Sequence, residues 1–142
     1  MTGIIAESCA ILLIGLFTYT AVSKLFDFAE FNTQMHSQGL PGKLDSLLIY
    51  AVPAAELSVT IILLIPSTRA YGFIFAAALM LLFTAYAGIA AAGLFPQMPC
   101  ACGGVLHHMG WKVHFLFNLF FLLLSCIGIY TINRERSVIG KE

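Results

Sequence analysis

Charged residues are scarce in this chain of 142 residues, where Lys, Arg, Asp and Glu together make up 10% and the formal net charge is zero. Soluble globular domains carry about 25% charged residues, so the composition excludes an ordinary soluble domain. A neutral chain also lacks the basic surface that a nucleic-acid-binding protein needs, and we expect no nucleic-acid partner. No internal repeat, low-complexity run or second domain is visible, so residues 1–142 are expected to form a single domain.

Hydrophobic residues make up 60% of the chain, and its mean hydropathy is +0.93. They gather in four apolar segments, at about 4–24, 47–65, 70–92 and 111–132. Each segment is close to the roughly 20 residues that a helix needs to cross a hydrocarbon core about 30 Å thick. Helices are the structures that satisfy their own backbone one segment at a time in lipid. We therefore expect an all-α integral membrane protein, a four-helix bundle in the lipid bilayer.

The ends of these segments predict how the helices are connected. No basic residue precedes the first segment, which is also longer than the apolar part of a signal peptide, so we expect it to remain as a helix. The sequence Pro66-Ser67-Thr68-Arg69 predicts a tight turn between the second and third helices. These two helices should therefore be antiparallel neighbours.

Basic residues near the helix ends give a small bias in orientation. With four helices both termini lie on one side, together with Arg69, Arg134, Arg136 and Lys141, whereas Lys24, Lys43 and Lys112 lie opposite. Cytoplasmic loops carry an excess of Lys and Arg. We expect a protein of the bacterial inner (cytoplasmic) membrane with both termini cytoplasmic. The loops at 27–46 and 93–112 are then extracytoplasmic.

Cysteine is scarce as well, yet Cys100 and Cys102 lie one residue apart between the third and fourth apolar segments. They are flanked by Pro99 and by Gly103-Gly104, which predict an irregular and accessible loop. A thiolate is the nucleophile of disulfide exchange, and a disulfide across one residue departs from relaxed geometry and is easily reduced. The loop predicts thiol-disulfide exchange with a protein partner outside the cytoplasm. Two unpaired thiols or a static bridge are the structural alternative.

Metal binding is the main functional alternative for this loop. His107 and His108 follow the cysteines closely, and Cys, His and Met are ligands suited to Cu(I) or Zn(II). The spacing matches no closed zinc pattern, so we assign no metal ligand. The two histidines would otherwise tune the thiols, or serve as ordinary polar residues at the membrane interface. A non-catalytic structural subunit remains the third possibility.

A polar stripe follows the loop on the fourth helix. Its members are Trp111, His114, Asn118 and Ser125, at helical spacing. Imidazole and carboxamide groups are costly against lipid, so this face should turn inward, with Trp111 at the interface. His114 is the candidate for carrying protons to and from the Cys pair, and a hydrogen bond that fixes helix packing is the alternative.

Glu56 lies near the middle of the second apolar segment, where an acidic residue marks a candidate functional site. It should be protonated unless it is paired. Tyr19 and Lys24 on the first helix are the possible partners. We expect Lys24 to be too shallow for a direct bond unless its side chain turns inward, which favours Tyr19 or a water molecule. Helix cohesion is the favoured role.

Two further cysteines, Cys9 and Cys126, lie inside the first and fourth apolar segments at similar depth. If those helices were adjacent, the two thiols would form a possible second pair for a transmembrane electron relay. Packing is the favoured explanation, because buried free cysteines are usually inert.

Two sets of residues resemble a known family. The first, typical of DoxX-like four-helix membrane proteins, is Gly15, Phe17, Tyr19, Ser23-Lys24-Leu25, Asp27, Gly39-Leu40-Pro41, Pro53 and Glu56-Leu57. The second, similar to the MauE branch, is the Cys-x-Cys-Gly-Gly loop with Trp111, His114 and Asn118.

The MauE member is implicated in maturing a periplasmic methylamine dehydrogenase rich in disulfides. The resemblance therefore implies a redox-associated membrane protein with Cys100 and Cys102 as the exchanging pair, and a possible thiol-disulfide oxidoreductase. It names no client protein. The Cys-x-x-Cys of the vitamin K epoxide reductase group is absent, so no quinone or other cofactor is assigned.

Overall fold

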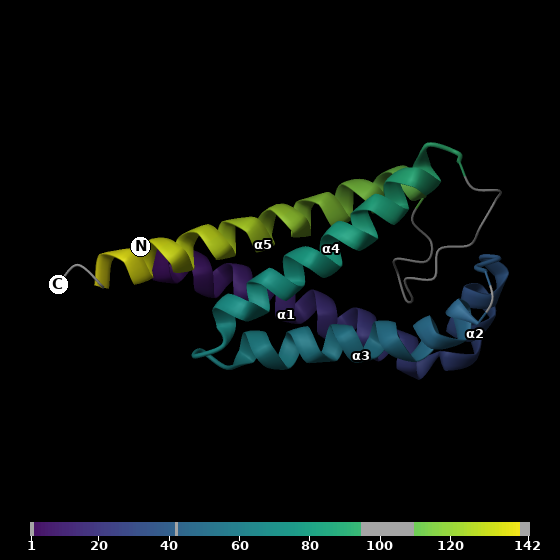
Figure 1. Cartoon of the computed structure of the whole chain (residues 1–142), viewed down its shortest axis with the longest axis horizontal. Coiled ribbons are helices and arrows are strands. Elements are labelled where there is room, and N and C mark those ends of the chain that lie inside the picture. Colours follow the sequence, from purple (N-terminus) through teal and green to yellow (C-terminus); the bar gives the residue numbers. More distant parts are fainter. Residues whose placement is uncertain (1, 42, 95–109, 140–142) are drawn as a thin grey trace.

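The structure, a computed structural model, describes residues 2–41, 43–94 and 110–139 (Figure 1). Four long helices dominate it: α1 (Thr2–Phe26), α3 (Leu44–Leu64), α4 (Arg69–Ala91) and α5 (Trp111–Ile139). All four are long and apolar enough to cross a membrane. The expected fold class, an all-α integral membrane four-helix bundle, is confirmed.

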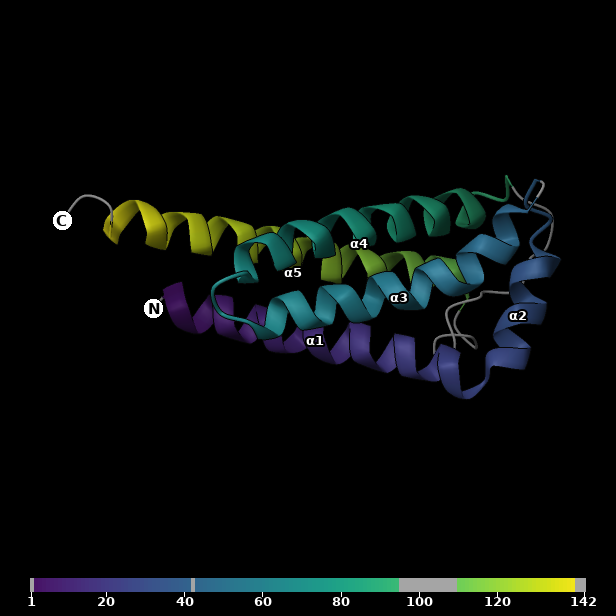
Figure 2. The same ribbon diagram turned by 60° about the horizontal axis from the view of Figure 1, so that its bottom comes forward.

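The long helices run side by side, with both termini at one end of the bundle (Figures 1 and 2). α4 packs most extensively against α5, and α1 packs against both α3 and α5. α3 and α4 are also in contact, as the short turn between them predicted. The Thr68 backbone N–H donates to the Ile65 carbonyl in this turn, at 3.1 Å. The C-terminal ends of α1 and α4 and the starts of α3 and α5 therefore lie together at the opposite end of the bundle.

The segment 27–46, expected to be a loop, contains a further helix, α2 (Phe28–Ser37). The Glu30 backbone N–H donates to the Asp27 side chain, which caps the start of α2. Phe31 and Met35 are buried against Ile49 at the start of α3. An acidic cap followed by Glu three residues later is a known signal for a helix start. The segment therefore forms a helix, although its polar composition predicts a loop. α2 lies across the end of the bundle that is opposite the termini (Figure 2).

The core lies where the long helices meet, and its largest fully buried apolar side chains are Phe17, Phe73, Leu13, Leu63 and Met80. Gly128 on α5 allows α4 and α5 to pack closely, because a Cβ at this position would lie 2.3 Å from Cε1 of Phe73 on α4. A side chain at position 128 would therefore push α4 and α5 apart. This packing fixes the half of the bundle nearer the termini and leaves the other half to form the candidate site.

Candidate functional site

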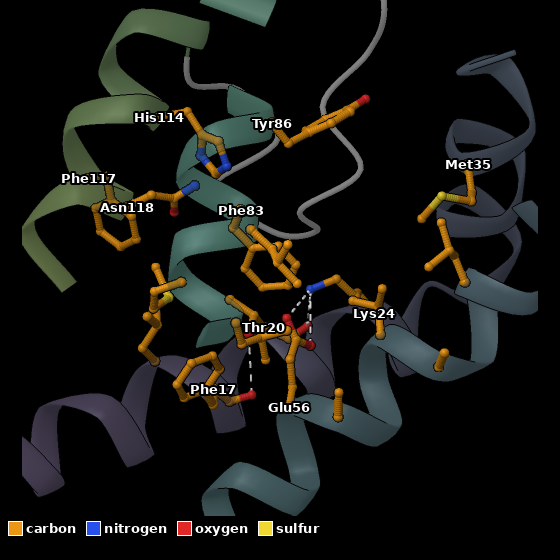
Figure 3. A pocket seen from close by; sticks show the side chains of 18 of the residues that line it. Phe17, Thr20, Lys24, Met35, Glu56, Phe83, Tyr86, His114, Phe117 and Asn118 are labelled. Carbon is orange, nitrogen blue, oxygen red and sulfur yellow. Dashed lines mark hydrogen bonds and ion pairs between the residues drawn. The ribbon is translucent and has the colours of Figure 1, made fainter. Parts of the chain in front are cut away.

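A cavity of about 400 Å³ lies between the helices in the half of the bundle nearer α2 (Figure 3). All five helices contribute side chains to it. The apolar lining includes Leu16, Phe17, Met35, Leu40, Leu48, Ala51, Val52, Ala55, Leu79, Met80, Leu82, Phe83 and Phe117. The polar lining consists of Thr20, Lys24, Gln38, Glu56, Tyr86, His114 and Asn118. An apolar cavity with a few convergent polar groups is the usual form of a small-molecule site.

Lys24 and Glu56 form a direct, buried ion pair on one wall of the cavity (Figure 3). Lys24 Nζ lies 2.8 Å from Oε1 and 3.1 Å from Oε2 of Glu56, and the two side chains are 4% and 1% exposed. Lys24 Nζ also donates to the Thr20 carbonyl, at 3.4 Å. The buried ammonium group is thus held by three acceptors at the edge of the cavity.

The expectation that Tyr19 or a water molecule, rather than Lys24, is the partner of Glu56 is wrong. The Lys24 side chain turns inward from the last turn of α1, because α2 folds over that end of the bundle. Phe31 of α2 covers the ammonium group, with its ring centroid 5.9 Å from Nζ. Tyr19 is 42% exposed and does not line the cavity. The ion pair joins α1 to α3, in keeping with the role in helix cohesion that was expected for Glu56.

His114 and Asn118 of α5 form part of the opposite wall (Figure 3). They are 3% and 4% exposed, and Ser125 on the same helix is fully buried, so the inward orientation of this polar face is confirmed. The Nδ2 atom of Asn118 is buried and has no hydrogen-bond partner in the part of the chain that the structure describes. An unsatisfied buried amide costs about 1–3 kcal/mol. Asn118 is therefore poised to donate to a group that enters the cavity.

The residues Tyr86 and Gln38, which sequence analysis missed, close the cavity toward α2. The Tyr86 hydroxyl donates to Oε1 of Gln38, at 2.8 Å. The Trp111 ring packs edge-on against Tyr86 and His114, with ring centroids 5.9 and 6.3 Å apart. Gln38 was missed because it lies just beyond α2, and Tyr86 because a tyrosine in an apolar segment carries no signal for the direction it faces.

The loop that carries the predicted thiol pair lies outside the described residues, and so do Cys100, Cys102, His107 and His108. The chain enters and leaves this loop close to the cavity. Tyr86 lies in the last two turns of α4, which ends at Ala91, and His114 lies in the first turn of α5. Among the described residues, no group of three or more His, Cys, Asp and Glu could hold a metal ion.

Cys9 and Cys126 lie on helices that do pack against each other, α1 and α5. Cys9 is buried in the core cluster of the bundle, whereas Cys126 is exposed on the outside of α5. Neither cysteine lines the cavity. Their placement agrees with packing for Cys9 and with contact to lipid for Cys126.

Comparison with known proteins gives one match of high coverage. The family described as methylamine utilisation protein MauE matches residues 2–131. No curated protein and no solved structure matches the chain. Because the family match covers most of the sequence, including three of the apolar helices and most of α5, the chain belongs to the MauE family of membrane proteins.

Proposed function

We propose that this protein exchanges thiols and disulfides with an extracytoplasmic partner protein during the maturation of that partner, through Cys100 and Cys102. The observation that carries the proposal is the Cys-x-Cys-Gly-Gly loop in a chain of the MauE family. The family's association with methylamine utilisation supports a role in preparing a redox protein. The same proposal places the chain in the bacterial inner membrane, with both termini cytoplasmic and the loop outside.

The exchange proceeds in two steps. The thiolate of one cysteine attacks a disulfide sulfur of the partner, which releases a partner thiolate and leaves a mixed disulfide. The second cysteine then attacks its neighbour's sulfur, which frees the partner as a dithiol and forms the Cys100–Cys102 disulfide. Two electrons pass to the partner in this direction, and the reverse reaction donates a disulfide to it.

His114 is the residue that we assign to proton transfer. It is buried in the first turn of α5, close along the chain to the cysteine loop, and its imidazole faces the cavity (Figure 3). A thiol must lose a proton before it attacks, and the leaving thiolate must gain one. Imidazole exchanges protons near neutral pH, which suits both steps.

Labelling of the thiols in intact cells tests the proposal. A membrane-impermeant maleimide should modify Cys100 and Cys102 directly in one part of the protein population, and only after mild reduction in the other part. That mixture would show that the pair cycles between dithiol and disulfide outside the cytoplasm. The single variants Cys100→Ser and Cys102→Ser should then trap a mixed disulfide that can be identified by mass spectrometry. Cys126→Ser is the matched control and should leave the labelling of the loop unchanged.

Two results would contradict the proposal. In one, the pair stays reduced in every condition and is shielded until a chelator is added, with stoichiometric copper or zinc in the purified protein. That result would assign the loop to metal binding through Cys100, Cys102, His107 and His108. In the other, partner maturation is unchanged when both loop cysteines are replaced by Ser, which would make the protein a structural subunit.

A further inference from the structure

The exchange reaction described above uses one lining residue of the cavity, His114, and leaves most of the cavity between the helices without a role. Its walls are apolar over most of their area, and most of its lining residues lie in the membrane-spanning helices. A molecule that is soluble in the bilayer suits such a space. The volume of about 400 Å³ is within the range of about 300–1,000 Å³ that small-molecule sites occupy, so the cavity has room for a ring system.

Asn118 shows what the ligand must carry. Its amide points into the cavity, is 4% exposed, and has no hydrogen-bond partner for Nδ2 among the described residues (Figure 3). Buried amide N–H groups are nearly always hydrogen-bonded, so an unpaired one that faces a cavity calls for an acceptor inside it. A ligand with a carbonyl oxygen at this point would satisfy the amide.

The shape and chemistry of the other cavity walls narrow the chemical class of the ligand. Phe17, Phe83 and Phe117 place aromatic rings around the space, which suits a flat ring in offset or edge contact (Figure 3). The Lys24–Glu56 ion pair lies on the wall facing Asn118 and places an ammonium group and a carboxylate beside a mostly apolar space. A flat, bilayer-soluble ring with carbonyl oxygens on opposite sides, which takes up protons when it is reduced, is a quinone.

We propose that this cavity binds a membrane quinone, with a carbonyl oxygen accepting a hydrogen bond from Asn118 and the ring lying between α1, α4 and α5 toward Lys24–Glu56. The proposal rests on the exchange function assigned to Cys100 and Cys102, for which the quinone is the electron acceptor. The dithiol forms one S–S bond and loses two electrons and two protons. The quinone gains two electrons and two protons and leaves as the quinol.

The only tryptophan of the chain supplies a direct readout of binding. Trp111 contacts Tyr86 and His114, both of which line the cavity, and a quinone is an efficient quencher of indole fluorescence. The experiment uses the full-length protein in phosphatidylcholine nanodiscs, titrated with decylubiquinone. We expect saturable quenching, and Asn118→Leu should weaken the apparent affinity about tenfold, the effect of one hydrogen bond to a buried group.

Matched variants separate binding from misfolding and from simple partitioning into lipid. Ala55 lines the cavity, whereas its neighbour Ala54 is exposed on the outside of α3. Ala55→Phe should abolish saturable quenching, and Ala54→Phe should leave it unchanged. Ser125→Ala, which removes a buried hydroxyl of α5 away from the cavity, should bind as the unaltered protein does. Quenching that never saturates and is equal in Ala54→Phe and Ala55→Phe would overturn the proposal and leave lipid as the occupant.

A second measurement keeps this proposal distinct from the exchange function. The reduced protein is mixed with decylubiquinone, and quinol formation is followed by absorbance while free thiols are counted. The Cys100→Ser/Cys102→Ser double variant should bind the quinone normally and form no quinol. Intact binding without quinol formation by the unaltered protein would refute the electron transfer and leave the binding site. Absence of binding in a protein whose loop cycles in cells would refute the quinone site and leave the exchange function.

Discussion

Lys24 and Glu56, which are 32 positions apart in the sequence, form an ion pair that is buried on both sides and joins α1 to α3, with Nζ 2.8 Å from the nearer carboxylate oxygen. Removing one partner leaves the other charge buried without compensation, which is worse than removing both. The pair therefore predicts an asymmetric response to single and double substitution.

Glu56→Gln and Lys24→Met should each lower the free energy of unfolding by about 3–5 kcal/mol, the cost of an uncompensated buried charge. The double variant Lys24→Met/Glu56→Leu should recover most of this loss. Equilibrium unfolding in detergent measures both. The half-exposed pair between Arg69 and Glu7 is the control, and Glu7→Gln should cost less than about 1 kcal/mol. Equal losses of unfolding free energy in Glu7→Gln and Glu56→Gln would contradict the explanation that burial makes the Lys24–Glu56 pair costly to break.

Gly128 and Phe73 predict a steric effect on the packing of α4 against α5. Gly128→Ala places a methyl group 2.3 Å from Cε1 of Phe73, and overpacking of this kind costs about 1–3 kcal/mol of unfolding free energy. Adding Phe73→Leu should restore part of the stability by making room. Gly15→Ala on α1 is the control, because a Cβ there meets nothing within 4 Å. It should be neutral or stabilising, and a loss of stability at Gly15 equal to that at Gly128 would refute the steric explanation.

Cys9 and Cys126 should differ in their reaction with a membrane-permeant maleimide. The exposed Cys126 is expected to react in the folded protein, and the buried Cys9 only after unfolding. Mass spectrometry of the peptides, with Cys100 and Cys102 replaced by Ser, measures the two rates. Because the two side chains have opposite environments, Cys9→Ser/Cys126→Ser should leave the exchange rate of the loop thiols unchanged. A large loss of the exchange rate in that variant would contradict this prediction and support the hypothesis of a transmembrane electron relay through Cys9 and Cys126.

His114→Phe should slow thiol-disulfide exchange by about 100-fold, at the lower end of what a positioned proton carrier contributes. The rate of reaction with oxidised glutathione is measured from pH 5 to pH 9. Loss of a proton carrier changes the shape of the pH profile, whereas a purely structural defect lowers the rate by the same factor at every pH. The control is Ser125→Ala on the same buried face of α5, which should retain both the rate and the profile.

Much of the fold is readable from local pattern. The four long helices follow from apolar runs of membrane-spanning length, and α4 begins directly after the Pro66 turn as expected. The inward face of α5 follows from the spacing of His114, Asn118 and Ser125, because polar groups at helical intervals share a face that lipid excludes. The start of α2 is also encoded locally, in the Asp27 cap and in Glu30, although the polar segment by itself predicts a loop.

Other features depend on contacts between distant segments. Whether Lys24 turns inward or outward is decided by α2 folding over it and by Glu56 lying within reach on α3. The depth of a lysine in the sequence does not contain that information, because its long side chain reaches in either direction. The orientations of Cys9 and Cys126 are also not readable from the sequence. Their similar depth on adjacent helices does not tell how each helix is rotated, and the structure has Cys9 buried and Cys126 exposed.

That this protein spans a membrane, where its four long helices lie and which face of α5 is buried can all be read from the amino-acid sequence, because hydrophobic length and helical period are local properties of the chain. Its cysteine loop also identified the candidate chemistry and the family. The pairing of Lys24 with Glu56, and the position of Asn118 across a mostly apolar cavity from them, follow from the packing of the helices alone. The physical reason is that a cavity is made by the relative rotation and packing of several helices, and no single segment carries it.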